Sequence, residues 1–304
     1  MKYWVTYPIV SHPPAADLMD RAGLIRFAET AEAAGFDGLG FTDHPAPSHK
    51  WLQAGGHDAL DPLAALAFVA GRTERMLLMP HILVLPYRNP FLVAKGAATL
   101  DLLSGGRFVL SVAAGYQRAE FTALGVDYEQ RNELFDEAVE VMRGVWNSDD
   151  FAYEGLTFSA RGQTANPKPA NVPIWIGGNS RVVRERVARY GDGWCPFPAP
   201  AALSRTTKTP GLETPADLAV MIDDLRRMLD ENGRDPSGID IAFRSAAGGS
   251  LGSDQFDAAA HVAELDELAA IGMTWNNVGV PGDSLAHALE SLERYGAEVI
   301  APSR

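Results

Sequence analysis

Short apolar runs alternate with segments of helical period from one end of the chain to the other. Within each run, apolar residues follow one another without the regular polar interruptions of a strand that faces water on one side. Such runs are typical of strands buried on both faces, in a parallel sheet that helices cover. Eight runs have this character: residues 3–10, 37–43, 76–85, 107–114, 172–177, 192–197, 239–246 and 274–280.

The segments between these runs have the spacing of amphipathic helices. Residues 214–232 begin with Thr214 in an N-cap position, Pro215 at the first helical position and Asp217 three residues after the cap. Residues 131–147 carry one apolar face, formed by Leu134, Phe135, Ala138, Val139, Met142, Val145 and Trp146. A predicted helix therefore follows each predicted strand.

Eight strand–helix units in 304 residues predict one α/β domain over residues 1–304, a closed (β/α)8 TIM barrel. A doubly wound open sheet is the alternative. Two connections are too long for plain turns, so we expect insertions after strands four and six. Residues 147–171 have the pattern of a hairpin. Residues 198–214 are polar and proline-rich, and they follow strand six on the side where a lid would lie.

The net charge of −13 argues against a nucleic-acid partner and against docking on anionic lipid, because both need a basic surface. No apolar run reaches the roughly 18 residues of a membrane helix. The N-terminus has the pattern of a first strand rather than of a signal peptide. A single cysteine, Cys195, excludes an internal disulfide and a thiolate zinc site. These features predict a cytoplasmic protein.

The segment GFTDHPAPSH, residues 40–49, places Asp43 and His44 immediately before Pro45, at the end of the second predicted strand. Active sites of such barrels lie at the carboxyl ends of the strands. This location favours a functional role over the structural alternative, in which Asp43 caps a turn and His44 is a surface histidine. The chain has no HxH pair and no HExxH motif, so we expect no catalytic metal.

The segment VPIWIGGNS, residues 172–180, runs from a strand into Gly177, Gly178, Asn179 and Ser180 before a helix. Glycines let the backbone approach an anion closely, and the first N–H groups of a helix bind phosphate. The alternative is an ordinary strand–helix turn in which Asn179 or Ser180 caps the helix.

The segment SVAAGYQRAEF, residues 111–121, ends the fourth predicted strand in small residues. Small residues up to Gly115 leave room for a flat ligand, or they permit tight packing of the strand against a helix. Tyr116 and Glu120 then supply polar groups near the mouth of the barrel. In the preceding segment two prolines bracket Arg88 and hold a cation in a rigid turn.

Four segments together resemble the luciferase-like monooxygenase superfamily of flavin and deazaflavin enzymes. They are AEAAGFDGLGFTDH (31–44), LPYRNPFLVAKGAATLDLLSGGRFVLSVAAG (85–115), PIWIGGNS (173–180) and YGDGWCPF (190–197). The resemblance covers the chain from residue 18 to about residue 300. It implies a (β/α)8 barrel with insertions, as the pattern of strands and helices also predicts.

The segments TLDLLSGGRF and PIWIGGNS are most similar to the branch that uses coenzyme F420, a deazaflavin, rather than reduced FMN with oxygen. The resemblance implies that the ring lies across the mouth and that the phosphate tail reaches Gly177–Ser180. It implies that Asp43 and His44 lie near the ring, with the histidine as a base or ring-positioning group. His81 and Ile82 match the position where relatives carry a non-proline cis peptide behind the ring.

The sequence departs from the family pattern at two places. Sugar-phosphate dehydrogenases of this branch carry a glutamate at the position of Tyr116, so their acid is absent and we do not expect that substrate. The fourth strand ends in SVAAG instead of a glycine-richer form, which affects the fit of the ring at Gly115. We expect Tyr116 and Trp194 on the substrate side, with Tyr116 also a catalytic candidate.

The sequence therefore predicts an F420-dependent oxidoreductase that transfers a hydride between C5 of the deazaflavin and a small organic substrate. His44, oriented by Asp43, is the predicted proton-handling group. The alternatives are an FMN-dependent monooxygenase and a flavin-binding barrel without catalysis. Members of the family commonly dimerise through helices on one side, so a homodimer is an expectation, although no apolar stripe identifies its helices.

Overall fold

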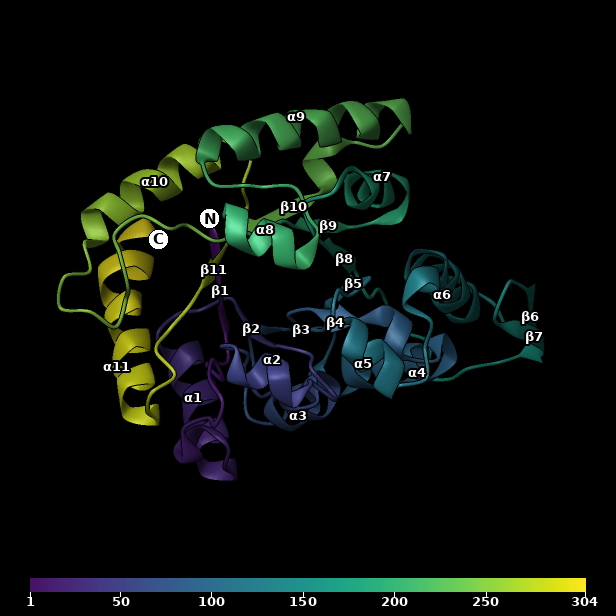
Figure 1. Ribbon diagram of the computed structural model, residues 1–304, viewed down its shortest axis with the longest axis horizontal. Coiled ribbons are helices and arrows are strands. Elements are labelled where there is room, and N and C mark those ends of the chain that lie inside the picture. The colour runs from purple at the N-terminus through teal and green to yellow at the C-terminus, as the bar shows by residue number, and fades with distance from the viewer.

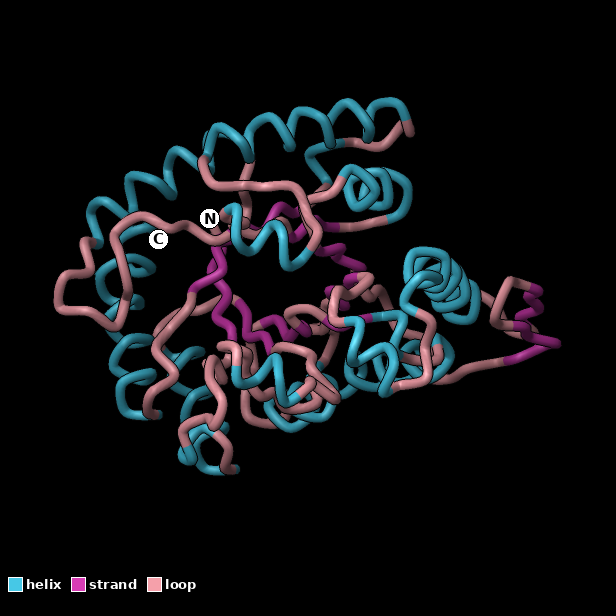
Figure 2. The backbone as a smooth tube through the Cα atoms, in the orientation of Figure 1, coloured by secondary structure: helices cyan, strands magenta, loops and turns pink.

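Parallel strands follow one another around a ring in the computed structural model, which describes residues 1–304 (Figures 1 and 2). Their order is β3-β2-β1-β11-β10-β9-β8-β5-β4. The strands are β1 (Lys2–Thr6), β2 (Gly38–Phe41), β3 (Leu77–Pro80), β4 (Leu83–Val84), β5 (Leu110–Ala113), β8 (Ile174–Gly177), β9 (Gly193–Cys195), β10 (Asp240–Phe243) and β11 (Trp275–Val278). Each lies within one of the eight predicted runs, except that β1 begins one residue before the first run.

The third predicted run forms two short strands, and together they close the barrel. β3 pairs with β2, whereas β4 pairs with β5. A parallel bridge between Leu78 and Phe108 joins the end of the sheet at β3 to the segment that leads into β5. β3 and β4 therefore act as one interrupted barrel strand, and the structure confirms the predicted (β/α)8 barrel rather than an open sheet.

Side chains that alternate along the strands fill two separate apolar layers. In β1, Tyr3 and Val5 belong to the large cluster of 62 buried residues between the strands and the helices, and Trp4 points into the barrel. The barrel interior holds a smaller cluster of Trp4, Met79, Val109, Trp175, Cys195, Ala242 and Trp275. The rings of Trp4 and Trp175 stack with their centroids 5.8 Å apart. Bulky side chains thus fill the barrel below its mouth.

Helices surround the ring of strands (Figure 2). They are α1 (Arg21–Ala33), α2 (His49–Gln53), α3 (Pro62–Ala70), α4 (Pro90–Ser104), α5 (Arg118–Ala123), α6 (Arg131–Asn147), α7 (Arg181–Tyr190), α8 (Ala201–Thr207), α9 (Pro215–Glu231), α10 (Ala258–Ile271) and α11 (Leu285–Tyr295). The predicted start of α9 is confirmed: Thr214 and Asp217 form a reciprocal capping box. None of the helices combines the length and hydropathy that crossing a membrane requires.

The two long connections contain short elements of their own. Between α6 and β8, strands β6 (Phe151–Glu154) and β7 (Ser159–Gln163) form an antiparallel hairpin that projects from the barrel (Figure 1, right). After β9, the chain forms α8 and returns to itself through a bridge between Ala199 and Leu212. This second segment contacts the loop after β8, where the Asn179 amide nitrogen donates to Pro210 O at 3.2 Å.

Candidate active site

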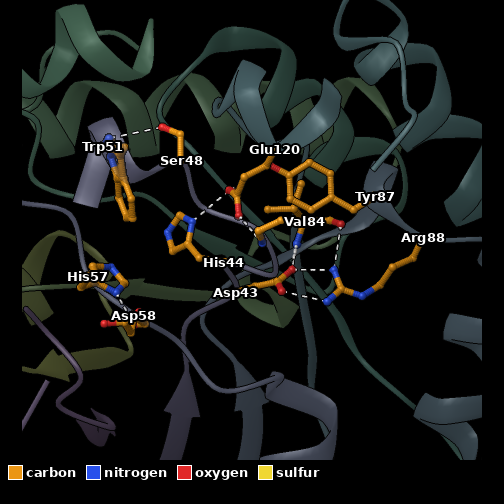
Figure 3. A network of polar contacts seen from close by, with 11 residues as sticks. Asp43, His44, Ser48, Trp51, His57, Asp58, Val84, Tyr87, Arg88 and Glu120 are labelled. Carbon is orange, nitrogen blue, oxygen red and sulfur yellow. Dashed lines mark hydrogen bonds and ion pairs between the residues drawn. The ribbon is translucent and has the colours of Figure 1, made fainter. Parts of the chain in front are cut away.

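Asp43 lies just beyond the carboxyl end of β2 and holds the third barrel strand in place. Its two carboxylate oxygens accept from Arg88 Nη1 at 2.6 Å and from Arg88 Nη2 at 2.8 Å (Figure 3). Val84 N also donates to Asp43, at 2.8 Å. The Asp43 side chain is only 1% exposed. A buried carboxylate with three donors, two of them from a fork of arginine, fixes the relative positions of two strand ends.

His44 has a different carboxylate partner, Glu120. The His44 Nδ1 atom lies 3.1 Å from Glu120 Oε2, and the Glu120 side chain is 1% exposed (Figure 3). Tyr87 OH donates to Glu120 Oε2 at 3.2 Å, and Ala46 N donates to Oε1 at 3.1 Å. A carboxylate held in this way favours the tautomer in which His44 Nδ1 donates, which leaves Nε2 free to accept a proton.

The predicted orientation of His44 by Asp43 is therefore wrong. Successive residues of an extended chain project to opposite sides, so Asp43 turns toward Arg88 while His44 turns toward Glu120. Asp43 instead anchors the chain around Val84 and Arg88, at the end of the third barrel strand. Sequence reasoning placed Glu120 near the mouth but did not pair it with His44, because these two residues are 76 positions apart.

Aromatic rings enclose the imidazole of His44. The Trp51 ring lies 4.6 Å away between centroids, and the His57 ring lies 5.1 Å away in a T-shaped arrangement (Figure 3). Burial lowers the pKa of His57, so its ring is neutral at pH 7. No group of three or more histidine, cysteine, aspartate or glutamate side chains is arranged to hold a metal ion. A buried carboxylate partner and the enclosing aromatic rings give His44 a pocket that suits proton transfer.

Tyr116 and Tyr87 both lie close to Glu120. Burial is the main cause that raises the pKa of each phenol, and the negative charge of Glu120 raises both further. Both phenols therefore keep their protons at neutral pH. Tyr116 is half-buried beyond β5, on the same side of the mouth as His44. The role of Tyr116 on the substrate side stays a prediction.

His81 and Ile82 join β3 to β4 through a cis peptide bond, as the family resemblance predicts. His81 Nε2 lies 2.9 Å from the amide nitrogen of Asn277, so Nε2 accepts and Nδ1 carries the proton. Nδ1 is buried and has no partner. Burial, together with the positive charge of Arg244, lowers the pKa of His81 to about 4. His81 is therefore a neutral donor at pH 7.

The loop after β8 combines structural contacts with free backbone donors. The buried Asn179 side chain bonds Phe197 and Pro210, so it is not available to a ligand. The Ser180 hydroxyl caps α7 by accepting from Val183 N. The backbone N–H groups of Ser180, Arg181 and Val182 have no hydrogen-bond acceptor in the structure. The turn is thus capped as the structural alternative expects, and it still offers three N–H donors at the start of a helix.

Two of the three glycine positions proposed to admit a cofactor are also close-packing positions. A β-carbon on Gly115, where φ is +80°, would lie 2.5 Å from Val84 Cγ1. A β-carbon on Gly177 would lie 2.2 Å from Ile82 Cδ1. Gly178 adopts a φ of +123°, which favours glycine. Packing against the third barrel strand therefore accounts for Gly115 and Gly177.

The substrate contact predicted for Trp194 does not fit its position. The side chain is fully buried between strands and helices, and Nε1 donates to Gly178 O at 2.9 Å. Alternation along β9 points Cys195 into the barrel instead, where burial raises the pKa of its thiol to about 12. Trp194 supports the loop after β8, and Cys195 is an inert interior residue.

A cavity of about 480 Å³ occupies the other side of the mouth, beyond the ends of β9, β10 and β11. Its lining residues are Trp4, His81, Pro196, Phe197, Pro198, Ala242, Phe243, Arg244, Ser245, Ala246, Gly249 and Asn277. Sequence reasoning missed Arg244. Its signal was a cation among the last residues of the seventh predicted run, 239–246, a position like that of Asp43 at the end of the second run.

The comparisons with known proteins agree on a family and a fold. A family model described as luciferase-like monooxygenase matches residues 2–298. An F420-dependent glucose-6-phosphate dehydrogenase of Segniliparus rotundus is 30% identical over 238 residues, which are 76% of this chain and 66% of that enzyme. The chain spans about half to two thirds of the length of the dehydrogenases of this kind that it matches.

Two further proteins widen the comparison. An FMNH(2)-dependent dimethylsulfone monooxygenase of Pseudomonas putida is 32% identical over 126 residues, 40% of this chain and 34% of that enzyme. An F420-dependent secondary alcohol dehydrogenase, solved with an F420–acetone adduct, superposes with a TM-score of 0.74 and 20% identity over 99% of both chains. At this level of identity, the superposition supports the fold alone.

Proposed function

The chain belongs to the luciferase-like monooxygenase family, and on that basis we propose that it is an oxidoreductase that uses coenzyme F420. The proposed reaction transfers a hydride between C5 of the deazaflavin and a small organic substrate. The observation that carries this proposal is the pair formed by His44 and the buried Glu120 at the barrel mouth. The similarity to F420-dependent dehydrogenases supports the choice of cofactor.

The residues at the mouth suit a flat cofactor with an anionic tail. The free N–H groups of Ser180, Arg181 and Val182 at the start of α7 would hold the phosphate of the tail. The buried His81 Nδ1–H has no partner in the protein and would serve as a donor beside the ring. When bound, coenzyme F420 accepts or donates a hydride at C5.

His44 is the proposed acceptor of the proton that the substrate releases together with the hydride. Oxidation of a hydroxyl-bearing carbon releases a hydride from carbon and a proton from oxygen, and His44 Nε2 would accept that proton. Glu120 stabilises the imidazolium through Nδ1, because the carboxylate is buried and its other donors hold it in position. In the reverse direction His44 would donate the proton. Trp51 and His57 enclose the imidazole and limit its contact with water.

A monooxygenase that uses reduced FMN and oxygen is the second candidate, and the similarity to the dimethylsulfone monooxygenase is the observation that favours it. Titrating the protein with oxidised coenzyme F420 and with FMN, side by side, separates the two candidates. We expect micromolar or tighter binding of the deazaflavin and no oxygen consumption by its reduced form. Tight binding of FMN, with substrate-dependent oxygen uptake, would replace the proposal by the monooxygenase. Binding of the deazaflavin without turnover on any substrate would support a binding protein.

A further inference from the structure

Arg244 is a cation without a partner at the edge of the mouth cavity. Arg244 directly follows β10 and lines the cavity of about 480 Å³. Its guanidinium makes no hydrogen bond or ion pair in the structure. None of the lining residues is an aspartate or a glutamate. Arg88, the arginine on the opposite side of the mouth, instead has both prongs of its fork on Asp43. The two arginines thus differ in whether the protein supplies their counter-charge.

The position of the Arg244 guanidinium is set by a glycine on the next strand end. A β-carbon on Gly279 would lie 2.1 Å from Arg244 Nη2 and 2.7 Å from its Cζ. The guanidinium therefore lies directly against the backbone after β11, in space that any larger residue at position 279 would occupy. The arginine is held at the cavity by a close fit, which an arginine extended into solvent would not need.

Arg244 supplies the only fixed charge in the cavity. The Arg244 side chain is exposed at the edge of the cavity, where partial desolvation by the surrounding residues lowers its pKa, but an arginine remains protonated at neutral pH. Its charge also contributes to the low pKa of His81, so the two side chains lie within electrostatic reach and His81 is neutral. No protein carboxylate neutralises this exposed cation at the cavity edge, and a planar guanidinium pairs well with carboxylate and phosphate.

We propose that Arg244 binds an anionic group of the substrate, a carboxylate or a phosphate, and so restricts the enzyme to anionic substrates. This inference rests on the proposed function, in which the deazaflavin occupies the remainder of the mouth. The phosphate tail of the cofactor has the same chemistry. However, the free donors for that tail follow β8, and Arg244 follows β10, with β9 between them in the barrel. The arrangement therefore favours the substrate as the source of the anion.

Calorimetric titration with small probes tests the inference without a known substrate. The probes are inorganic phosphate, acetate and acetamide, which has the shape of acetate without its charge. All are titrated at constant ionic strength into the protein alone and into the protein saturated with coenzyme F420. We expect millimolar binding of phosphate and acetate in both states and at least tenfold weaker binding of acetamide. Equal binding of acetate and acetamide would overturn the inference.

Four variants locate the anion. Arg244→Met removes the charge and Gly279→Ala displaces the guanidinium, so both should weaken phosphate binding at least tenfold. Arg244→Lys keeps a charge and should retain more affinity for phosphate than Arg244→Met; it also serves if the methionine variant does not fold. Arg26→Met is the matched control, because Arg26 is exposed on α1 and makes no hydrogen bond or ion pair.

Each result bears on one hypothesis. Phosphate affinity that is the same in Arg244→Met, Arg244→Lys and the unaltered protein would overturn the assignment of the anion to Arg244. Loss of phosphate binding when coenzyme F420 is present, with a tenfold weaker affinity of Arg244→Met for the cofactor, would assign Arg244 to the tail of the cofactor instead. Failure of the unaltered protein to bind coenzyme F420, with Arg244-dependent phosphate binding intact, would reject the proposed function and keep the anion site.

Discussion

The two sides of the barrel mouth differ in how completely the protein satisfies its own polar groups. On the side of β2, β4 and β5, Asp43 and Glu120 together accept from five protein groups, and both are almost fully buried. On the side of β10 and β11, Arg244 has no counter-charge, and His81, whose ring reaches this cavity from the turn between β3 and β4, has no acceptor for Nδ1. We infer that the first side is built to hold one geometry for proton transfer, and that the second is left for a ligand to complete.

The largest expected effect comes from removing a buried carboxylate on the side of β2, β4 and β5. Asp43→Ala would leave Arg88 without its main partner in a mostly buried position, so we expect the free energy of unfolding to fall by about 3 kcal/mol. Breaking a buried ion pair usually costs about 3–5 kcal/mol. We expect a loss near the lower end of that range, because Asp61 lies 3.6 Å from Arg88 and still neutralises part of its charge. Urea denaturation measures the change. Glu29→Ala, which removes an exposed partner of Arg72, is the control and should cost less than about 1 kcal/mol. Equal losses would contradict the role of Asp43 as the buried partner that holds Arg88.

The proton transfer proposed for the side of β2, β4 and β5 depends on His44. His44→Ala should lower turnover by about a hundredfold or more, because removal of a general acid or base typically costs 10²–10⁴-fold. The dissociation constant for coenzyme F420 and the melting temperature should change only modestly. His49→Ala provides the matched control, since His49 is an exposed histidine five residues away at the start of α2. A folded His44→Ala enzyme with near-normal turnover would return His44 to a structural role.

The start of α7 lies between the two sides, and one backbone donor there can be removed without breaking the helix. Proline is favoured at the first helical position, and Ser180 already has an extended backbone with ψ of 157°. Arg181→Pro removes an N–H that has no protein partner, whereas Arg181→Ala removes only the side chain. We expect Arg181→Pro to bind coenzyme F420 about tenfold more weakly than Arg181→Ala. Equal affinities of these two variants in fluorescence titrations would remove the phosphate contact from this residue.

A further expected effect concerns pH and the side of β10 and β11. The pKa of His81 falls from 6.5 in the unfolded chain to about 4 in the folded protein, so the unfolded state binds more protons between these values. The contribution of His81 to stability is complete above pH 6.5 and is lost as the pH falls toward 4. Urea midpoints of the unaltered protein and of His81→Gln, compared at pH 7.5, 6 and 5, should converge toward low pH. A difference between the two proteins that stays constant with pH would contradict the neutral, buried imidazole.

Much of this fold could be predicted from local pattern alone. Runs of apolar residues buried on both faces predicted eight barrel strands, and the caps of α9 followed from residues that are neighbours in sequence. The rule that active sites lie at the carboxyl ends of barrel strands then placed Asp43, His44 and Tyr116 at one mouth. These features depend on periodicity and chain direction, which the order of residues contains directly.

The partners of those residues were decided by the tertiary structure. His44 meets Glu120 across 76 positions, and Asp43 meets Arg88 across 45, because the curvature and register of the closed barrel bring particular strand ends together. The same closure turns Trp194 toward the helices and leaves Arg244 against Gly279 without a counter-charge. The sequence determined which groups reach the mouth, and the packing of the barrel determined which of them are satisfied by the protein and which are left for a ligand.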